Sequence, residues 1–332
     1  MAKFSETGPR SPVVESIRVD KVSPRYRTGH TIRAVFAWTF ALIGLIPVGV
    51  MLITAFKTRA DIVSTPPKLI FKPTLEGFVY LLTDRVQISA KEKEELLANY
   101  ENLGWMDRVA LQSGQKINGP SEFVGTLKNS LIIAGLSTLL AVGLGLFAAY
   151  AFSRFNVMGK NDLLFFILST RMLPAVVVTI PLFLMYRQLK LYDTHLGLTL
   201  LYTVFSLSLV VWLLKCFIDE IPKEYEEAAL IDGYSRMQAF YKIVLPQAVT
   251  GIAATTVFVL IFAWNEYAFA LMMTSESART APPGIATMLG IGGIEWSAIA
   301  AGALGFLIPV VIVTFALRKY LLRGVTFGAI RQ

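Results

Sequence analysis

Residues 219–246 read DEIPKEYEEAALIDGYSRMQAFYKIVLP, and this stretch decides which kind of protein the chain forms. Pro222 can begin a helix, acidic residues fill its first turn, and Gly233 can end it in a left-handed conformation. A second short helix is expected from its cap, Ser235, until Pro246 redirects the chain. The pattern predicts a two-helix elbow of a kind that suits insertion into a groove on a partner protein.

The sequence on either side of this elbow is too apolar for an ordinary soluble domain. Of its 332 residues, 55% are hydrophobic and 16% are charged, whereas about a quarter of the residues are charged in a soluble domain. A helix needs about 20 apolar residues to cross a bilayer. Six stretches meet that length: 34–56, 129–152, 163–186, 196–214, 249–274 and 296–317. Short-range alternation is missing, so we predict an all-α membrane protein with six transmembrane helices rather than a barrel.

The distribution of Lys and Arg predicts how these spans are oriented. With the N-terminus inside, the inner segments hold 17 basic residues and the two short outer loops hold three. Basic residues favour the cytoplasmic side, so both termini are expected in the cytoplasm. The expected parts are a tail (1–33), a first span (34–56), an outer loop (57–124), a core of five further spans (125–317) with the inner loop 219–248, and a second tail (318–332). Within the outer loop, Ser89 and Glu92 form a capping pattern that predicts a short amphipathic helix.

Several functional classes are excluded by residues that the sequence lacks. One cysteine and two distant histidines are too few for a disulfide framework or the usual His/Cys metal site. No G-x4-G-K-[ST] stretch can cradle a nucleotide, and no G-x-S-x-G or H-E-x-x-H pattern is present. We therefore expect no catalytic residue, no metal and no cofactor. The basic residues are dispersed and reflect topology, so no nucleic-acid partner is expected.

The inner loop carries one further pattern. Glu227-Ala228-Ala229 is followed by three residues, Gly233, nine residues and then Ile243-x-Leu245-Pro246. This spacing resembles the EAA signature in the membrane subunits of bacterial ABC importers. The resemblance covers residues 34–332 and implies the fold of a type I ABC importer permease, a six-helix bundle whose cytoplasmic coupling helix lies at about 223–233.

Other patterns are similar to the carbohydrate-uptake branch of that family, the maltose-permease-like subunits. They are Arg171-Met-Leu-Pro174, Ile180-Pro-Leu-Phe183, Trp264-Asn-Glu266 and the C-terminal Gly328-Ala-Ile-Arg-Gln332. The chain departs from the branch in two places. Residues 84–120 lengthen the first outer loop, and the tail ends Ile-Arg-Gln where the branch commonly ends Val-Lys-Gly.

The resemblance implies partners for the chain and roles for particular residues. The partners are a pair of ABC ATPase subunits, a second permease subunit in a heterodimer, an extracytoplasmic solute-binding protein and the lipid bilayer of the bacterial inner membrane. The residues expected to couple to the ATPase are Glu227, Ala228, Ala229, Asp232, Gly233, Ile243, Leu245 and Pro246. A second contact with the ATPase pair is expected from the tail residues Gly328, Ala329, Ile330, Arg331 and Gln332.

Polar side chains within the spans are candidates for the substrate path, because such groups are costly at membrane depth unless they face the bundle or a watery route. The candidates are Trp264, Asn265, Glu266, Arg171 and Tyr202. A structural interpretation stays open for each of them. Glu266 can instead form an ion pair with Arg171 or Lys128, and Tyr202 can simply pack.

The sequence thus predicts the membrane subunit of an ATP-driven, binding-protein-dependent importer of a sugar or polyol. The ATP would be hydrolysed by the partner subunits, so the chain itself is not expected to be an enzyme. One alternative is an ABC permease for amino acids or peptides. A stand-alone ion-coupled carrier is a second, and it would be expected to show broken helices in two matched halves.

Overall fold

The computed structural model of the chain describes residues 24–290 and 293–327. It divides into two compact units, residues 1–50 and 51–332, and each is considered separately. Residues 24–50 of the helix α1 (Pro24–Ala55) make up the described part of the first unit, and its last turn belongs to the second. The helix begins at Pro24, within the expected tail 1–33, whereas its candidate membrane span begins at Ile32. A proline is tolerated in the first turn of a helix, where its missing N–H would have no partner.

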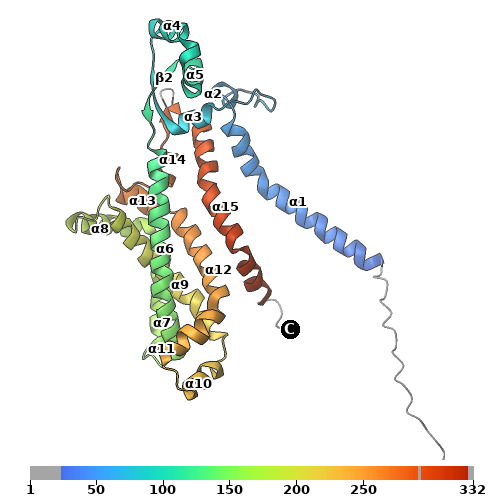
Figure 1. Cartoon of the computed structure of the whole chain (residues 1–332), viewed down its shortest axis with the longest axis vertical. Helices are drawn as coiled ribbons and strands as arrows, with labels where there is room; N and C mark the ends of the chain where they lie inside the picture. Colours follow the sequence, from blue (N-terminus) through green and yellow to red (C-terminus); the bar gives the residue numbers. More distant parts are fainter. Residues whose placement is uncertain (1–23, 291–292, 328–332) are drawn as a thin grey trace, which may run out of the picture. The chain divides into compact units, whose positions relative to one another are not determined.

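Residues 57–122 of the second unit form a small α/β layer, which we call the cap (Figure 1). The sequence predicted one helix in this loop, whereas the structure has several short elements. They are α2 (Arg59–Ile62), α3 (Glu76–Leu82), β1 (Thr83–Gln87), α4 (Ala90–Ala98), η1 (Tyr100–Asn102), α5 (Trp105–Gln112) and β2 (Gln115–Pro120). The Ser89 hydroxyl accepts from the Glu92 N–H at 3.3 Å and so caps α4. Strands β1 and β2 pair antiparallel across the base of the cap.

Four long apolar helices run through the rest of the second unit. They are α6 (Phe123–Arg154), α9 (His195–Asp219), α12 (Leu245–Trp264) and α15 (Trp296–Phe327). Counting α1, five described helices are long and apolar enough to span a membrane, and one bent helix pair could supply a sixth. The structure differs most from the six continuous spans that the sequence predicts at this bent pair of helices.

The third predicted span is broken in the middle. α7 (Lys160–Ser169) runs into the short turn η2 (Thr170–Met172), and α8 (Ala175–Gln188) then leaves at 92° to it. Pro174 explains the break, because a proline disfavours helical geometry in the residue before it. Leu173 accordingly takes an extended conformation with ψ 122°.

The fifth predicted span begins earlier and ends earlier than expected. α11 (Arg236–Ala239) continues through the π-helical turn η3 (Phe240–Val244) into α12, so Pro246 does not redirect the chain. In a regular α-helix the ring of Pro246 would clash with the carbonyl group four residues earlier. The π turn has wider hydrogen-bond spacing before Pro246, so the helix continues past the proline. The helix stops at Trp264, and a separate short helix, α13 (Ala268–Met273), follows.

Close contacts between α6, α9 and α12 hold the bundle together. A Cβ placed on Gly145 of α6 would lie 2.4 Å from Val210 Cγ1 on α9. A Cβ on Gly251 of α12 would lie 2.3 Å from the Phe217 ring on α9. Small residues let membrane helices approach in this way. The remaining elements, α14 (Ala281–Ala286), β3 (Leu289–Gly290) and β4 (Gly293–Ile294), lie between α13 and α15 in sequence, and α14 packs on α6.

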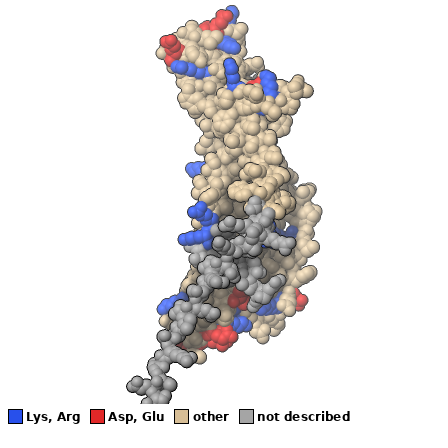
Figure 2. Space-filling model, turned by 90° about the vertical axis from the view of Figure 1, so that its right-hand side faces the viewer, with Lys and Arg blue, Asp and Glu red and all other residues tan. Residues whose placement is uncertain are grey.

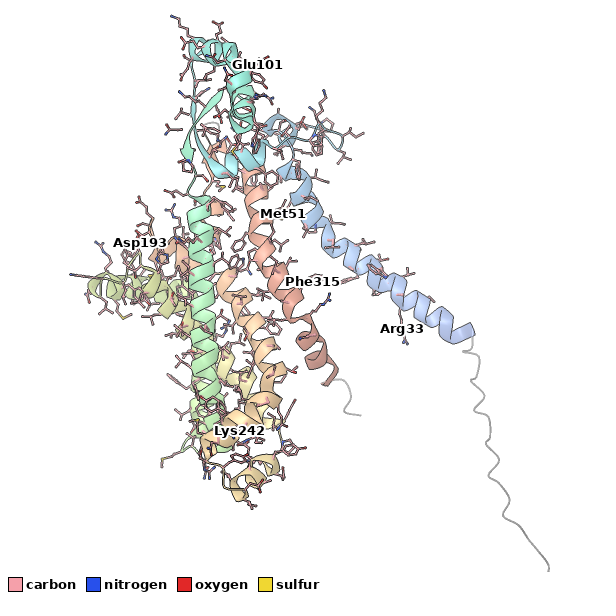
Figure 3. The ribbon with its side chains drawn as sticks, viewed as in Figure 1. Arg33, Met51, Glu101, Asp193, Lys242 and Phe315 are labelled. Atoms are coloured by element: carbon pink, nitrogen blue, oxygen red, sulfur yellow. The ribbon has the colours of Figure 1, made fainter. Side chains whose placement is uncertain are left out.

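Charged side chains gather at the two ends of this unit. On the face drawn in Figure 2, acidic and basic side chains lie over the cap and again over the opposite end, and the surface directly below the cap carries none. Within α6 and α9 the charged residues, Lys128, Arg154, Lys215 and Asp219, lie near the helix ends, and α12 has none. Figure 3 places Glu101 in the cap and Lys242 at the opposite end of the bundle. This is the distribution expected of a bundle whose middle lies in lipid.

Candidate functional site

The elbow forms at the end of the bundle opposite the cap. Its first helix, α10 (Glu224–Ile231), is stopped by Gly233, which has a φ of +91°. The Tyr234 N–H donates to the Ala229 carbonyl at 3.0 Å across this turn, as in a glycine-terminated helix. Ser235 then caps α11 in a capping box with Gln238. The sequence-predicted start, stop and second start of the elbow are all present.

The tip of the elbow presents both polar and apolar side chains to the surroundings. Glu227, Ala228, Asp232 and Gly233 are exposed, and Ile231 is 87% exposed. Ala229 is buried against the bundle instead. The exposed large side chains around the same tip are Tyr225, Tyr234, Met237 and Tyr241. Exposed apolar groups of this kind mark a surface that meets another protein or a membrane.

The later residues of the EAA pattern lie away from the tip. Ile243 belongs to the π turn η3, and Leu245 and Pro246 open α12. Leu245 is half-buried and Pro246 is exposed. These three residues shape the entry of the chain into the bundle rather than the elbow surface.

A buried ion pair fixes the elbow to the bundle, and the sequence did not single it out. Glu226 of α10 is paired with Arg154 at the end of α6, and both side chains are almost fully buried. The Tyr150 hydroxyl donates to Glu226 at 2.9 Å, and Arg154 also donates to the Ile221 carbonyl at 2.9 Å. The sequence holds one indication of this ion pair. Arg154 ends a long apolar span, and several acidic residues lie in the inner loop 219–248. Because the sequence offered adjacent carboxylates, only the structure distinguishes buried Glu226 from exposed Glu227.

Two helix breaks meet at a partly open cavity of the bundle. The break between α7 and α8 supplies Arg171, and the break between α12 and α13 supplies Glu266. Both line a cavity of about 200 Å³ together with Tyr202 of α9. Its remaining walls are largely apolar: Leu173, Ala175, Phe205, Ser206, Phe262, Ala263 and Phe269. A mostly apolar hollow with a few convergent polar groups is typical of a small-molecule site.

Hydrogen bonds hold the two charged groups of this cavity in place. The Glu266 carboxylate accepts from the Tyr202 hydroxyl at 3.0 Å and from the N–H groups of Phe269 and Ala270 at 3.0 and 3.1 Å. Glu266 therefore also caps α13. The Arg171 guanidinium donates to the Phe205 carbonyl at 3.0 Å. No ion pair joins Glu266 to Arg171 or Lys128 among the described residues.

Two of the predicted path residues lie outside this cavity. Trp264 is 3% exposed, and its ring stacks on the Phe306 ring with 4.7 Å between the ring centroids. Its Nε1–H donates to the Phe306 carbonyl at 3.1 Å. The Asn265 amide donates back to the Ile261 carbonyl at 2.8 Å. The structure thus brings together Arg171, Tyr202 and Glu266 and separates Trp264 and Asn265 from them.

The carboxylate of Asp193 accepts hydrogen bonds from the loop that follows α13, residues 275–278. Asp193, which lies between α8 and α9 (Figure 3), accepts from the N–H groups of Ser275, Glu276, Ser277 and Ala278 at 3.0 to 3.2 Å. Burial alone would raise the pKa of Asp193, but the hydrogen bonds from Ala278, Ser275 and Ser277 together hold it well below its usual range. The loop after α13 is therefore tied to the loop before α9.

The expected C-terminal contact, Gly328 to Gln332, lies outside the described residues. The same is true of residues 1–23 in the expected N-terminal tail. Within the described residues, no group of three or more His, Cys, Asp or Glu side chains could hold a metal ion.

Comparisons with known proteins show what this chain is similar to in sequence and in fold. The chain is 30% identical over 312 residues to a probable ABC transporter permease protein, y4oR, of Sinorhizobium fredii, covering 92% of this chain and 98% of that protein. It is 37% identical over 211 residues to the trehalose/maltose transport system permease protein MalG of Thermococcus litoralis, covering 63% and 76%. Its fold is similar to a chain in the crystal structure of a bacterial ABC transporter involved in alginate import, with TM-score 0.61 and 20% identity over 90% of this chain and 99% of that one.

The family model for the binding-protein-dependent transport system inner membrane component matches residues 141–327. This range includes the elbow, both helix breaks and the cavity between them. The chain is a multi-pass membrane protein that belongs to the family of inner membrane components of binding-protein-dependent transport systems, the permease subunits of ABC transporters.

Proposed function

We propose that the chain is the permease subunit of an importer for a sugar or polyol and that partner ATPase subunits drive it through the elbow. The observation that carries this proposal is the exposed elbow, a rigid helix ended by Gly233 and pinned to α6 by Glu226. A helix fixed at its base transmits a push on its tip as a rigid lever. The ATPases would bind at Glu227, Ala228, Asp232 and Gly233, with the ends of the chain in the cytoplasm of a bacterial cell and the cap outside.

The assembly we infer contains a second permease subunit, two ATPases and an extracytoplasmic solute-binding protein. The tail 328–332 would reach the ATPase pair. The ATP state and solute binding would then be linked reciprocally, because each biases the same two-state bundle. A sugar is favoured over other solutes because several related permeases are named for trehalose, maltose or diacetylchitobiose uptake.

The cavity between the two helix breaks is the proposed substrate path. Arg171 offers donors, Glu266 offers acceptors and Tyr202 offers a hydroxyl, and together they suit a ligand rich in hydroxyl groups. Helix breaks at membrane depth occur where the backbone lines a cavity. The carrier alternative also expects broken helices, but membership in the permease family removes its main support.

Uptake of radiolabelled trehalose into proteoliposomes by the complete transporter tests the path. Glu266→Gln and Tyr202→Phe each remove one polar contact in the cavity and are expected to reduce uptake about tenfold, since one hydrogen bond to a charged group is worth roughly 1.5–3 kcal/mol. Asn265→Ala is the matched control, because Asn265 neighbours Glu266 without lining the cavity. Equal uptake by all three variants would remove the cavity from the path.

A further inference from the structure

Two adjoining cavities open in the cap, outside the surfaces used above. One has a volume of about 410 Å³ and the other about 960 Å³. Tyr80, Gln115 and Glu295 line both of them. Their remaining walls come from the cap, from the starts of α6 and α15, and from α14 and the residues beside it. Ligand pockets commonly measure about 300–1,000 Å³, so each is large enough for a small molecule.

The wall that the two cavities share contains a buried carboxylate with an unused oxygen. The Glu295 residue is 3% exposed, and its Oε1 lies 3.7 Å from Arg59 Nη1. Its Oε2 is buried without a hydrogen bond. Burial raises the pKa of this carboxyl, and the charges of Arg85 and Arg59 oppose that rise. Because a buried polar atom without a partner costs free energy, Oε2 is expected to meet a donor that the chain itself does not supply.

Unused donors lie in the same wall. The Arg85 guanidinium lies 3.3 Å above the centre of the Tyr80 ring, and its Nη1 donates to Gln115 Oε1 at 2.9 Å. Its Nε is buried without a partner, and so is the Tyr80 hydroxyl. Ser113 donates to Glu76 at 2.9 Å at the edge of the larger cavity. Three residues that line these cavities, Glu295, Arg85 and Tyr80, therefore each hold a buried polar atom without a partner.

Charged side chains of both signs line the two cavities. The acidic ones are Glu76, Asp84, Glu122 and Glu295, and the basic ones are Arg59, Arg85 and Arg279. A ligand with a net charge would meet repulsion from one of these sets, whereas a hydroxyl group can donate to a carboxylate and accept from a guanidinium. We propose that the cap holds a binding site for a neutral, hydroxyl-rich small molecule, with Glu295 as acceptor and Arg85 and Tyr80 as donors.

This inference rests on the proposed function only in placing the cap outside the cytoplasm, where such a solute would arrive. The test is equilibrium binding of radiolabelled trehalose to the purified full-length chain in nanodiscs, without a solute-binding protein. Glu295→Gln is expected to weaken binding roughly 10-fold to 100-fold, as removal of a charged hydrogen-bonding partner does. Because Glu295 also lies 3.7 Å from Arg59, the thermal unfolding temperature of the variant is measured beside its binding, and weaker binding at an unchanged unfolding temperature supports the site.

A second variant and a control complete the design. Gln115→Ala alters both cavities at a half-buried position and is expected to weaken binding in the same direction. Glu95→Gln removes an exposed carboxylate of α4 and is expected to leave binding unchanged. Neither cavity includes Glu95.

Three results would overturn the proposal. The first is no saturable binding of trehalose, maltose or glycerol by the wild-type chain, or binding of methionine in their place. The second is equal binding by the wild-type chain, Glu295→Gln and Gln115→Ala. The third is binding that Glu266→Gln abolishes and Glu295→Gln does not, because the sugar would then lie between the spans. A transporter that imports trehalose while its cap binds none contradicts this inference alone and leaves the proposed function intact.

Discussion

At the scale of single residues, Gly233 is the position where backbone conformation matters most to the elbow. Its φ of +91° is a region that residues with a Cβ rarely adopt, yet no atom lies within 4 Å of a Cβ built there. Gly233→Val should therefore act through the backbone and not through a clash, at a cost of about 1–3 kcal/mol. We expect this variant to lose ATP-coupled transport in proteoliposomes.

The control for this prediction is Gly233→Asn. Asparagine tolerates the left-handed region better than other residues with a side chain. It should retain most of the transport that the valine variant loses. Full transport by Gly233→Val would show that the turn at Gly233 is not part of the coupling.

Glu226 and Glu227 are neighbours with opposite expected roles. Glu226 is paired with Arg154 in a buried site, and removal of one partner from such a pair costs roughly 3–5 kcal/mol. Glu226→Gln should lower the thermal unfolding temperature of the purified chain. Glu227→Gln should leave that temperature unchanged, because Glu227 is exposed, and should instead weaken co-purification with the ATPase. If both variants unfold at the wild-type temperature, the anchor assigned to Glu226 is wrong.

Asp193 predicts a pH dependence with a definite sign. Its folded-state pKa is held below the unfolded value of about 3.9, so its stabilising contribution is present above that pH and is lost as pH falls towards the folded value. Asp193→Asn should unfold at a lower temperature than wild type from pH 7 to about pH 4. The difference should shrink at lower pH. Thermal unfolding with Glu95→Gln as control measures it, and a difference that grows as pH falls would contradict the assignment.

At the scale of elements, Pro174 indicates a kink in the third span, but the sequence gives neither the size of that bend nor the break after Trp264. Residues 163–186 and 249–274 are each apolar enough to read as one continuous span. An apolar composition shows that a segment is long enough to span the membrane, but it does not show whether the helix is straight. Pro174 was therefore the only local indication of the 92° bend after Met172. Nothing in the local sequence predicts that α12 ends at Trp264. The Glu266 side chain caps α13 only after the chain has folded, by accepting from the Phe269 N–H.

The bend predicts a distance change that can be measured. Spin labels at Phe165 and Met185, both exposed, report the angle between α7 and α8 once the lone Cys216 is replaced by Ser. Pro174→Ala should lengthen the label separation, because it relieves the restriction on Leu173 and lets the helix straighten. Pro181→Ala is the control, because Pro181 lies inside α8 and not at the bend. An unchanged distance in Pro174→Ala would assign the bend to packing alone.

The elbow was predictable because its signals are local. The glycine stop, the Ser235 cap and the acidic first turn of α10 each act within a few residues. The pairing of β1 with β2 was not predictable, because its two strands are separated by α4, η1 and α5 and are short. The cavity between the breaks depends on three distant segments, and the sequence supplied its polar residues without showing that Trp264 and Asn265 lie elsewhere.

At the scale of the whole molecule, residues 51–327 combine a charged cap, an apolar bundle and a charged elbow. This order matches a protein that receives a solute at one end and a mechanical signal at the other. The buried anchor at Glu226 and the cavity at Glu266 belong to the same bundle, in which α6, α9 and α12 are in close contact. Closely packed helices move as units, so a displacement of the elbow can reach the cavity.

The most direct test of coupling is ATP hydrolysis by this chain assembled with its candidate ATPase and partner permease, with and without loaded solute-binding protein. The measurement is made across a panel of sugars and polyols, for wild type and Gly233→Val. We predict that one loaded binding protein stimulates hydrolysis by the wild-type assembly and that Gly233→Val abolishes the stimulation. Failure of the chain to associate stably with any ATPase, or equal stimulation of both assemblies, would contradict the account.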